Sequence, residues 1–187
     1  MRRPRKRGLT LLLAAACFAA AGEAQEARTL ELPDGERVSY TLRVHPADAH
    51  LLDAAATLPP ASPLQAAKLL NRHLLAGNIE EAALLSNAPR RRFEVFREYR
   101  DAVGEDEFKR VFGRYFYPEN RLLAEIAIGR HRLLIWELKD AGAGAPHVAG
   151  QYFVEVEGRY FMDDVPSATR SQLRQVLEAW RSGAARP

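Results

Sequence analysis

Carboxylates and arginines alternate between residues 120 and 164. Of all the residues in the chain, these are the ones whose types and spacing could form ion pairs or support acid/base catalysis. Three glutamates recur among three arginines: Glu125, Glu137, Glu155, Arg130, Arg132 and Arg159. Because opposite charges on neighbouring strands attract, this pattern favours cross-strand ion pairs. A carboxylate in an apolar pocket would instead have a raised pKa, and a nearby histidine or tyrosine could then relay a proton. That acid/base alternative stays open.

The same stretch carries the strongest strand signals. Leu122, Ala124 and Ile126 alternate with Leu123 and Glu125, which predicts a strand over residues 122–128. The run 131–138 has large apolar groups on both of its faces, so we expect this strand to be covered on both sides. Residues 151–156 and 159–162 predict a hairpin across a Glu-Gly turn.

Proline and glycine positions predict helices before and after these strands. Helices are expected over residues 63–76, 79–85, 89–103 and 105–117, and after Ser167. Two alternating runs around Pro33-Asp34-Gly35 predict an N-terminal hairpin, and residues 46–56 predict a short helix. The proline-rich break at 58–63 predicts a boundary. The expected organisation is a signal peptide (1–24), a hairpin and linker (25–61), and an α+β domain with a C-terminal helix (62–183).

The N-terminus has the layout of a secretory signal peptide, with a basic segment, an apolar run and small residues before Gln25. Residues 1–24 hold five of the 27 basic and one of the 24 acidic residues, which leaves 22 basic against 23 acidic and a net charge of −1. Nucleic-acid binding is therefore not expected. Cys17 is the one cysteine, which excludes a disulfide framework and favours a bacterial periplasm or secretion. Lipidation at Cys17, and with it membrane anchoring, is the alternative.

The order of elements resembles a known superfamily. A helix, Ala-Gly-Asn (76–78), a short helix, Leu-Leu-Ser-Asn (84–87), further helix and strands ending in Gly158 to Asp164 follow each other. This order resembles the nuclear transport factor 2-like superfamily, and within it small secreted bacterial proteins of unknown role. The resemblance covers about residues 62–166. It implies a cystatin-like α+β cone, in which helices pack into a curved antiparallel sheet.

In enzymes of the resembled superfamily, polar groups at the open end of the cone do acid/base work on a small apolar substrate. The resemblance therefore implies candidate groups here: Glu125, His131, Tyr152, Glu137, Tyr115 and Asp163. An isomerase- or dehydratase-like enzyme using Glu125, His131 and Tyr152 is the alternative function. The superfamily's catalytic motif cannot be matched residue by residue, which favours a protein without catalysis.

Standard signatures of catalysis and cofactor binding are missing from the sequence. It has no paired-histidine zinc helix, no phosphate-binding Gly-Lys loop and no Gly-x-Ser-x-Gly motif, so no cofactor and no metal are expected. Asp163 and Asp164 could ligate a divalent cation, but a turn role before Pro166 is favoured since no third acidic residue has matching spacing.

Two surfaces are candidates for binding. Four aromatic residues on the expected concave sheet form a predicted ligand site: Tyr115, Trp136, Tyr152 and Phe161. Arg90, Arg91, Arg92 and Arg97 give one helix a basic side for an acidic partner, unless Glu94, Glu98 and Asp101 balance it. We therefore expect a non-catalytic periplasmic or secreted binding module of the bacterial envelope. Its partner would be a small apolar ligand or an envelope protein, and a homodimer stays open.

Overall fold

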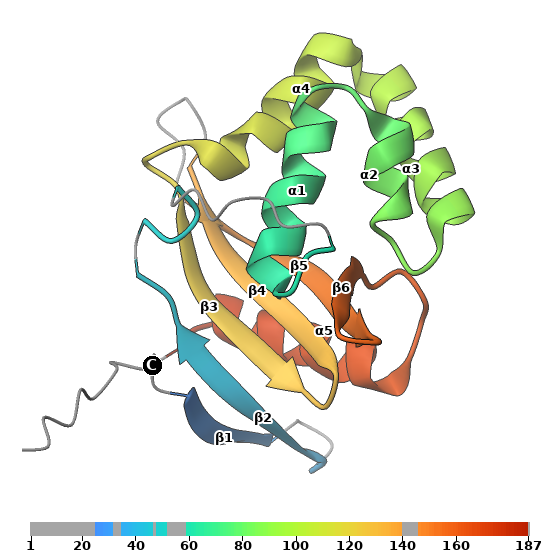
Figure 1. The fold of residues 1–187 in the computed structure, drawn as a ribbon. Coiled ribbons are helices and arrows are strands. Elements are labelled where there is room, and N and C mark those ends of the chain that lie inside the picture. Colours follow the sequence, from blue (N-terminus) through green and yellow to red (C-terminus); the bar gives the residue numbers. More distant parts are fainter. Residues whose placement is uncertain (1–24, 32–34, 47, 52–58, 140–145, 187) are drawn as a thin grey trace, which may run out of the picture.

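The computed structural model describes residues 25–31, 35–46, 48–51, 59–139 and 146–186 (Figure 1). Six antiparallel strands form one curved sheet in chain order. They are β1 (Gln25–Glu31), β2 (Arg37–Val44), β3 (Arg121–Ile128), β4 (His131–Leu138), β5 (His147–Val156) and β6 (Arg159–Met162). The expected α+β class is confirmed. The predicted signal peptide, Cys17 and most of the linker at 52–58 lie outside the described residues.

Helices cover both faces of this sheet (Figure 1). One group comprises α1 (Pro63–Leu75), α2 (Ile79–Leu84), α3 (Pro89–Val103) and α4 (Glu105–Gly113), which runs into the 3-10 turn η1 (Arg114–Phe116). The helix α5 (Ala168–Arg181) lies on the opposite face. The side chains of Ser62 and Ser167 cap α1 and α5 by accepting hydrogen bonds from backbone amides.

The alternation of β4 divides the core into two layers. Leu133 and Ile135 pack with Leu173, Leu177 and other residues of α5, whereas Leu134 and Trp136 pack beneath α1. The prediction that this strand is covered on both sides is confirmed. Gly150 of β5 allows α5 to approach closely, because a Cβ atom there would lie 2.6 Å from Leu177 and 2.9 Å from Leu133.

Two sequence-based expectations need correction. The register between β3 and β4 shifts between Leu122 and Ala124, and this bulge turns Leu122 onto the α1 face, away from Ala124 and Ile126. The N-terminal hairpin is part of the main sheet, because β2 pairs with β3 and Val38 packs against α5 residues. In the predicted helix at 46–56, the described residues 48–51 form a turn. No helix in the described ranges has the length and apolarity needed to cross a membrane.

Candidate functional site

Glu125 lies at the centre of a polar cluster on the α1 face of the sheet. Its side chain is buried, with one oxygen 3.4 Å from His45 Nε2 and the other 3.6 Å from Arg132 Nε. Arg43 is the register partner of Glu125 on β2. The two contacts are longer than ordinary hydrogen bonds. This Glu125 cluster therefore joins adjacent strands through loose ionic contacts.

A second cluster, around Asp163 and Asp164, follows the end of β6. Asp163 is 1% exposed; its Oδ2 lies 2.9 Å from His131 Nδ1, and its Oδ1 accepts a hydrogen bond of 3.0 Å from the side chain of Asn87. Asp164 accepts hydrogen bonds from both Arg92 Nε, at 2.7 Å, and the Arg92 terminal nitrogen. This Asp163–Asp164 cluster therefore joins the α2–α3 loop, β4 and the segment before α5.

Further bonds close the Asp163–Asp164 cluster. Ser86 donates a hydrogen bond of 2.6 Å to Asp164, and the Asp164 amide donates one of 2.8 Å to Asn87. Burial, followed by the positive charges of Arg170 and Arg91, lowers the pKa of Arg92 to about 10, so Arg92 stays charged at neutral pH. Both aspartates have protein partners, and no group of three or more potential metal-ligating residues is present in the described part of the chain.

The structure does not bring the predicted acid/base residues together. Glu125 faces α1, whereas His131 and Tyr152 share the α5 face with Leu133. Of the three arginines expected to pair with the glutamates, Arg132 lies 3.6 Å from Glu125, whereas Glu137 pairs with Arg121, at 2.7 Å. Glu155 accepts a hydrogen bond from the Tyr160 hydroxyl rather than pairing with an arginine. The histidine beside Glu125 is His45, which no sequence pattern singles out.

The four predicted ligand-binding aromatics are divided between the two faces of the sheet. Tyr115 and Trp136 meet edge to face on the α1 side, with ring centroids 5.1 Å apart, and burial raises the pKa of Tyr115 to about 12. Tyr152 and Phe161 lie on the opposite face, where the guanidinium of Arg170 covers the Tyr152 ring at 5.3 Å. The four rings therefore do not line one concave surface.

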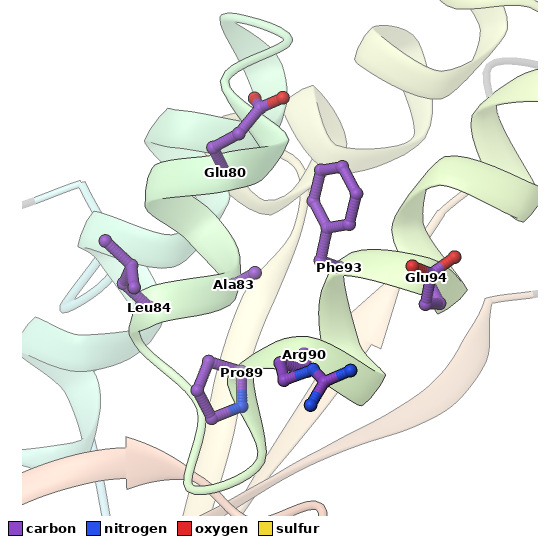
Figure 2. Close-up of a pocket in the computed structure, with 7 residues that line it drawn as sticks. All are labelled: Glu80, Ala83, Leu84, Pro89, Arg90, Phe93 and Glu94. Atoms are coloured by element: carbon purple, nitrogen blue, oxygen red, sulfur yellow. The ribbon is translucent and has the colours of Figure 1, made fainter.

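A groove between α2 and α3 is one of the described cavities that could hold a ligand (Figure 2). Its volume is about 530 Å³, and its lining is mainly apolar. The Phe93 ring stands between the two helices, with Glu80 toward one end and Arg90 toward the other (Figure 2). Leu84 on its rim is 68% exposed. The lining residues are Glu80, Ala83, Leu84, Pro89, Arg90, Phe93 and Glu94.

The predicted basic helix surface is divided in two. Arg92 turns inward to Asp164, and Arg97 pairs with Glu94. Arg90 and Arg91 are exposed, and neither has a carboxylate partner among the described residues. The predicted balance of charges therefore holds for the later part of α3 but not for its first turn.

Comparison of the chain with protein-family models, with curated proteins and with solved structures gave no match.

Proposed function

We propose that this protein is a non-catalytic binding module of the bacterial envelope, periplasmic or secreted, that holds a small apolar ligand in the groove between α2 and α3. The observation that carries this proposal is the groove itself. It is walled by Ala83, Leu84, Pro89 and Phe93, and its volume of about 530 Å³ lies in the range typical of small-molecule sites. The signal peptide that the sequence predicts over residues 1–24 supports the compartment.

The arrangement of the Glu125 cluster supports the proposal that the protein is not an enzyme. A catalytic carboxylate has to be free to meet its substrate, but both oxygens of Glu125 already have protein neighbours, His45 Nε2 at 3.4 Å and Arg132 Nε at 3.6 Å. The proposed family is the nuclear transport factor 2-like superfamily, and the antiparallel sheet with helices packed into it is compatible with this proposal.

Titration with the neutral fluorescent probe N-phenyl-1-naphthylamine tests the groove. Leu84→Glu places a charge on its rim, and we expect probe affinity to fall roughly tenfold, since burying a leucine side chain contributes about 1.5–3 kcal/mol. Val95→Glu is the matched control because Val95 is an exposed apolar residue of α3 outside the groove lining. Equal affinities of the two variants, or no probe binding by the wild type, would contradict the proposal.

One observation favours an acid/base enzyme as the second candidate. The buried Asp163 carboxylate holds His131 through Nδ1, an arrangement that leaves Nε2 to exchange a proton. Assays for isomerisation and dehydration of small apolar carbonyl and hydroxyl compounds decide between the two functions. Reproducible turnover that disappears in His131→Ala, or in Glu125→Ala, would establish the enzyme and overturn the non-catalytic proposal.

A further inference from the structure

The first halves of α3 and α5 carry four arginines besides Arg92, and the two helices begin near one junction of the fold. Arg90 and Arg91 belong to the first turn of α3, and Arg170 and Arg174 belong to the first half of α5. Arg92 donates to the Asp164 carboxylate and the Asp164 amide donates to Asn87, and these bonds hold the segment before α5 beside the start of α3. The segment after β6 passes near the α2–α3 loop (Figure 1). We call these four residues the α3–α5 basic face.

The arginines of this face differ from other arginines in the chain. In the described residues, none of the four has a carboxylate partner, whereas Arg97, Arg110, Arg121 and Arg181 each pair with a glutamate. Arg170 Nε is buried without a hydrogen-bond acceptor. Burial first, and then the charges of Arg170 and Arg91, lower the pKa of Arg92. The junction therefore concentrates positive charge that the described carboxylates do not neutralise.

Apolar residues project beside this charge. Val165 follows Asp164 directly and is 47% exposed, and the adjacent Pro166 is also exposed. Basic side chains around an exposed apolar tip match a membrane interface, because anionic headgroups attract the cations while the apolar tip enters the headgroup region. A dissolved polyanion would satisfy the arginines and leave Val165 in water.

We propose that the α3–α5 basic face docks the protein on the surface of an anionic lipid membrane, with Val165 at the contact. The phosphate groups of several lipids would each meet a different arginine, which suits charges distributed over two helices better than one small anion does. This docking goes beyond the proposed groove ligand and does not depend on it.

Sedimentation with vesicles of phosphatidylglycerol and phosphatidylcholine tests the proposal. Arg91→Gln/Arg174→Gln should lower the partition coefficient about 25-fold, because each arginine near an anionic surface contributes roughly fivefold. The control Arg110→Gln/Arg121→Gln removes the same charge from exposed, glutamate-paired positions and should retain most of the binding. All proteins carry the same N-terminus, so any contribution of residues 1–24 is common to them.

Further measurements separate a lipid surface from other anions. Val165→Ser should weaken vesicle binding severalfold without changing circular dichroism or the binding of polyphosphate in solution. Pure phosphatidylcholine vesicles should not bind the protein. Equal losses in the two double variants, or an unchanged partition coefficient in Val165→Ser, would overturn the proposal. Tight polyphosphate binding without vesicle binding would also overturn it and assign the face to a soluble anion.

Discussion

The Glu125 cluster and the Asp163–Asp164 cluster contain the same chemical groups in different arrangements. Each combines carboxylate, imidazole and guanidinium: Glu125 with His45 and Arg132, and the aspartates with His131 and Arg92. The two aspartates accept hydrogen bonds from three side chains, those of Ser86, Asn87 and Arg92. A fourth side chain, His131, lies within hydrogen-bond distance of Asp163. Glu125 has contacts of 3.4 and 3.6 Å. Similar composition therefore gives two different degrees of coupling.

The difference follows from which elements the clusters join. His45, Glu125 and Arg132 come from adjacent strands or their ends, and the sheet's backbone ladder already holds those strands together. The Asp163–Asp164 cluster holds the α2–α3 loop to the segment that follows β6. The backbone of this loop pairs with the sheet only through an isolated bridge between Ser86 and Met162 and the hydrogen bonds beside it, among the described residues. We infer that the aspartates stabilise the fold, whereas Glu125 mainly sets the charge of the α1 face.

The largest expected effect is that of Arg92→Ala. It leaves the carboxylate of Asp164, whose side chain is 4% exposed, without its cation, and breaking a buried ion pair in this way costs about 3–5 kcal/mol. Urea denaturation should show that decrease in the free energy of unfolding. Arg97→Ala, which breaks an exposed pair with Glu94, should cost about 1 kcal/mol or less.

A double variant separates the charge from the packing of Arg92. Adding Asp164→Asn to Arg92→Ala removes the unpaired charge and should recover a substantial part of the lost stability, because the amide still accepts the hydrogen bond from Ser86. If the double variant is no more stable than Arg92→Ala, the cost comes from lost side-chain packing, and the comparison between the clusters loses its electrostatic basis.

The sequence predicts the local elements well because their signals are local. Ser62-Pro63 and Ser167 mark helix starts, and the two faces of residues 131–138 reveal a strand covered on both sides. The bulge after Leu122 is not visible in an alternating pattern, because an extra residue in one strand leaves its composition unchanged.

The contacts of the Asp163–Asp164 cluster are less predictable, because they join residues that lie far apart in the sequence. Ser86, Asn87 and Arg92 meet Asp164 across more than 70 residues of chain, and no spacing rule connects such positions. Arg92 could not be distinguished from Arg90 and Arg91 by charge, although it alone of the three turns inward to Asp164. The α2–α3 groove likewise depends on how two helices pack, which their separate periodicities do not specify.

Stability at alkaline pH tests whether water is excluded from Tyr115, which lies on the α1 face outside the Glu125 cluster. Burial raises the pKa of Tyr115 to about 12, above the value near 10 of an unfolded tyrosine. Its contribution is therefore fully present below pH 10 and is lost as the pH rises toward 12, by about 3 kcal/mol at most. Tyr115→Phe should lack this part of the pH dependence in denaturation curves at pH 9 to 11.5. Parallel curves for both proteins would mean that water reaches the phenol beside Trp136.

The smallest effect is expected for Glu125→Gln, the change that compares the clusters most directly with Asp164→Asn. Both substitutions remove one negative charge with little change in shape. After Glu125→Gln, Arg132 still donates to the carbonyl groups of Gly129 and His131, at 2.7 and 2.9 Å, and still lies over the Tyr160 ring. The cation keeps partners, so we expect a loss of about 1 kcal/mol or less. Asp164→Asn leaves the partly buried Arg92 without its bidentate carboxylate and should cost several times more. A loss in Glu125→Gln as large as that in Asp164→Asn would show that the longer contacts of Glu125 also hold the fold together.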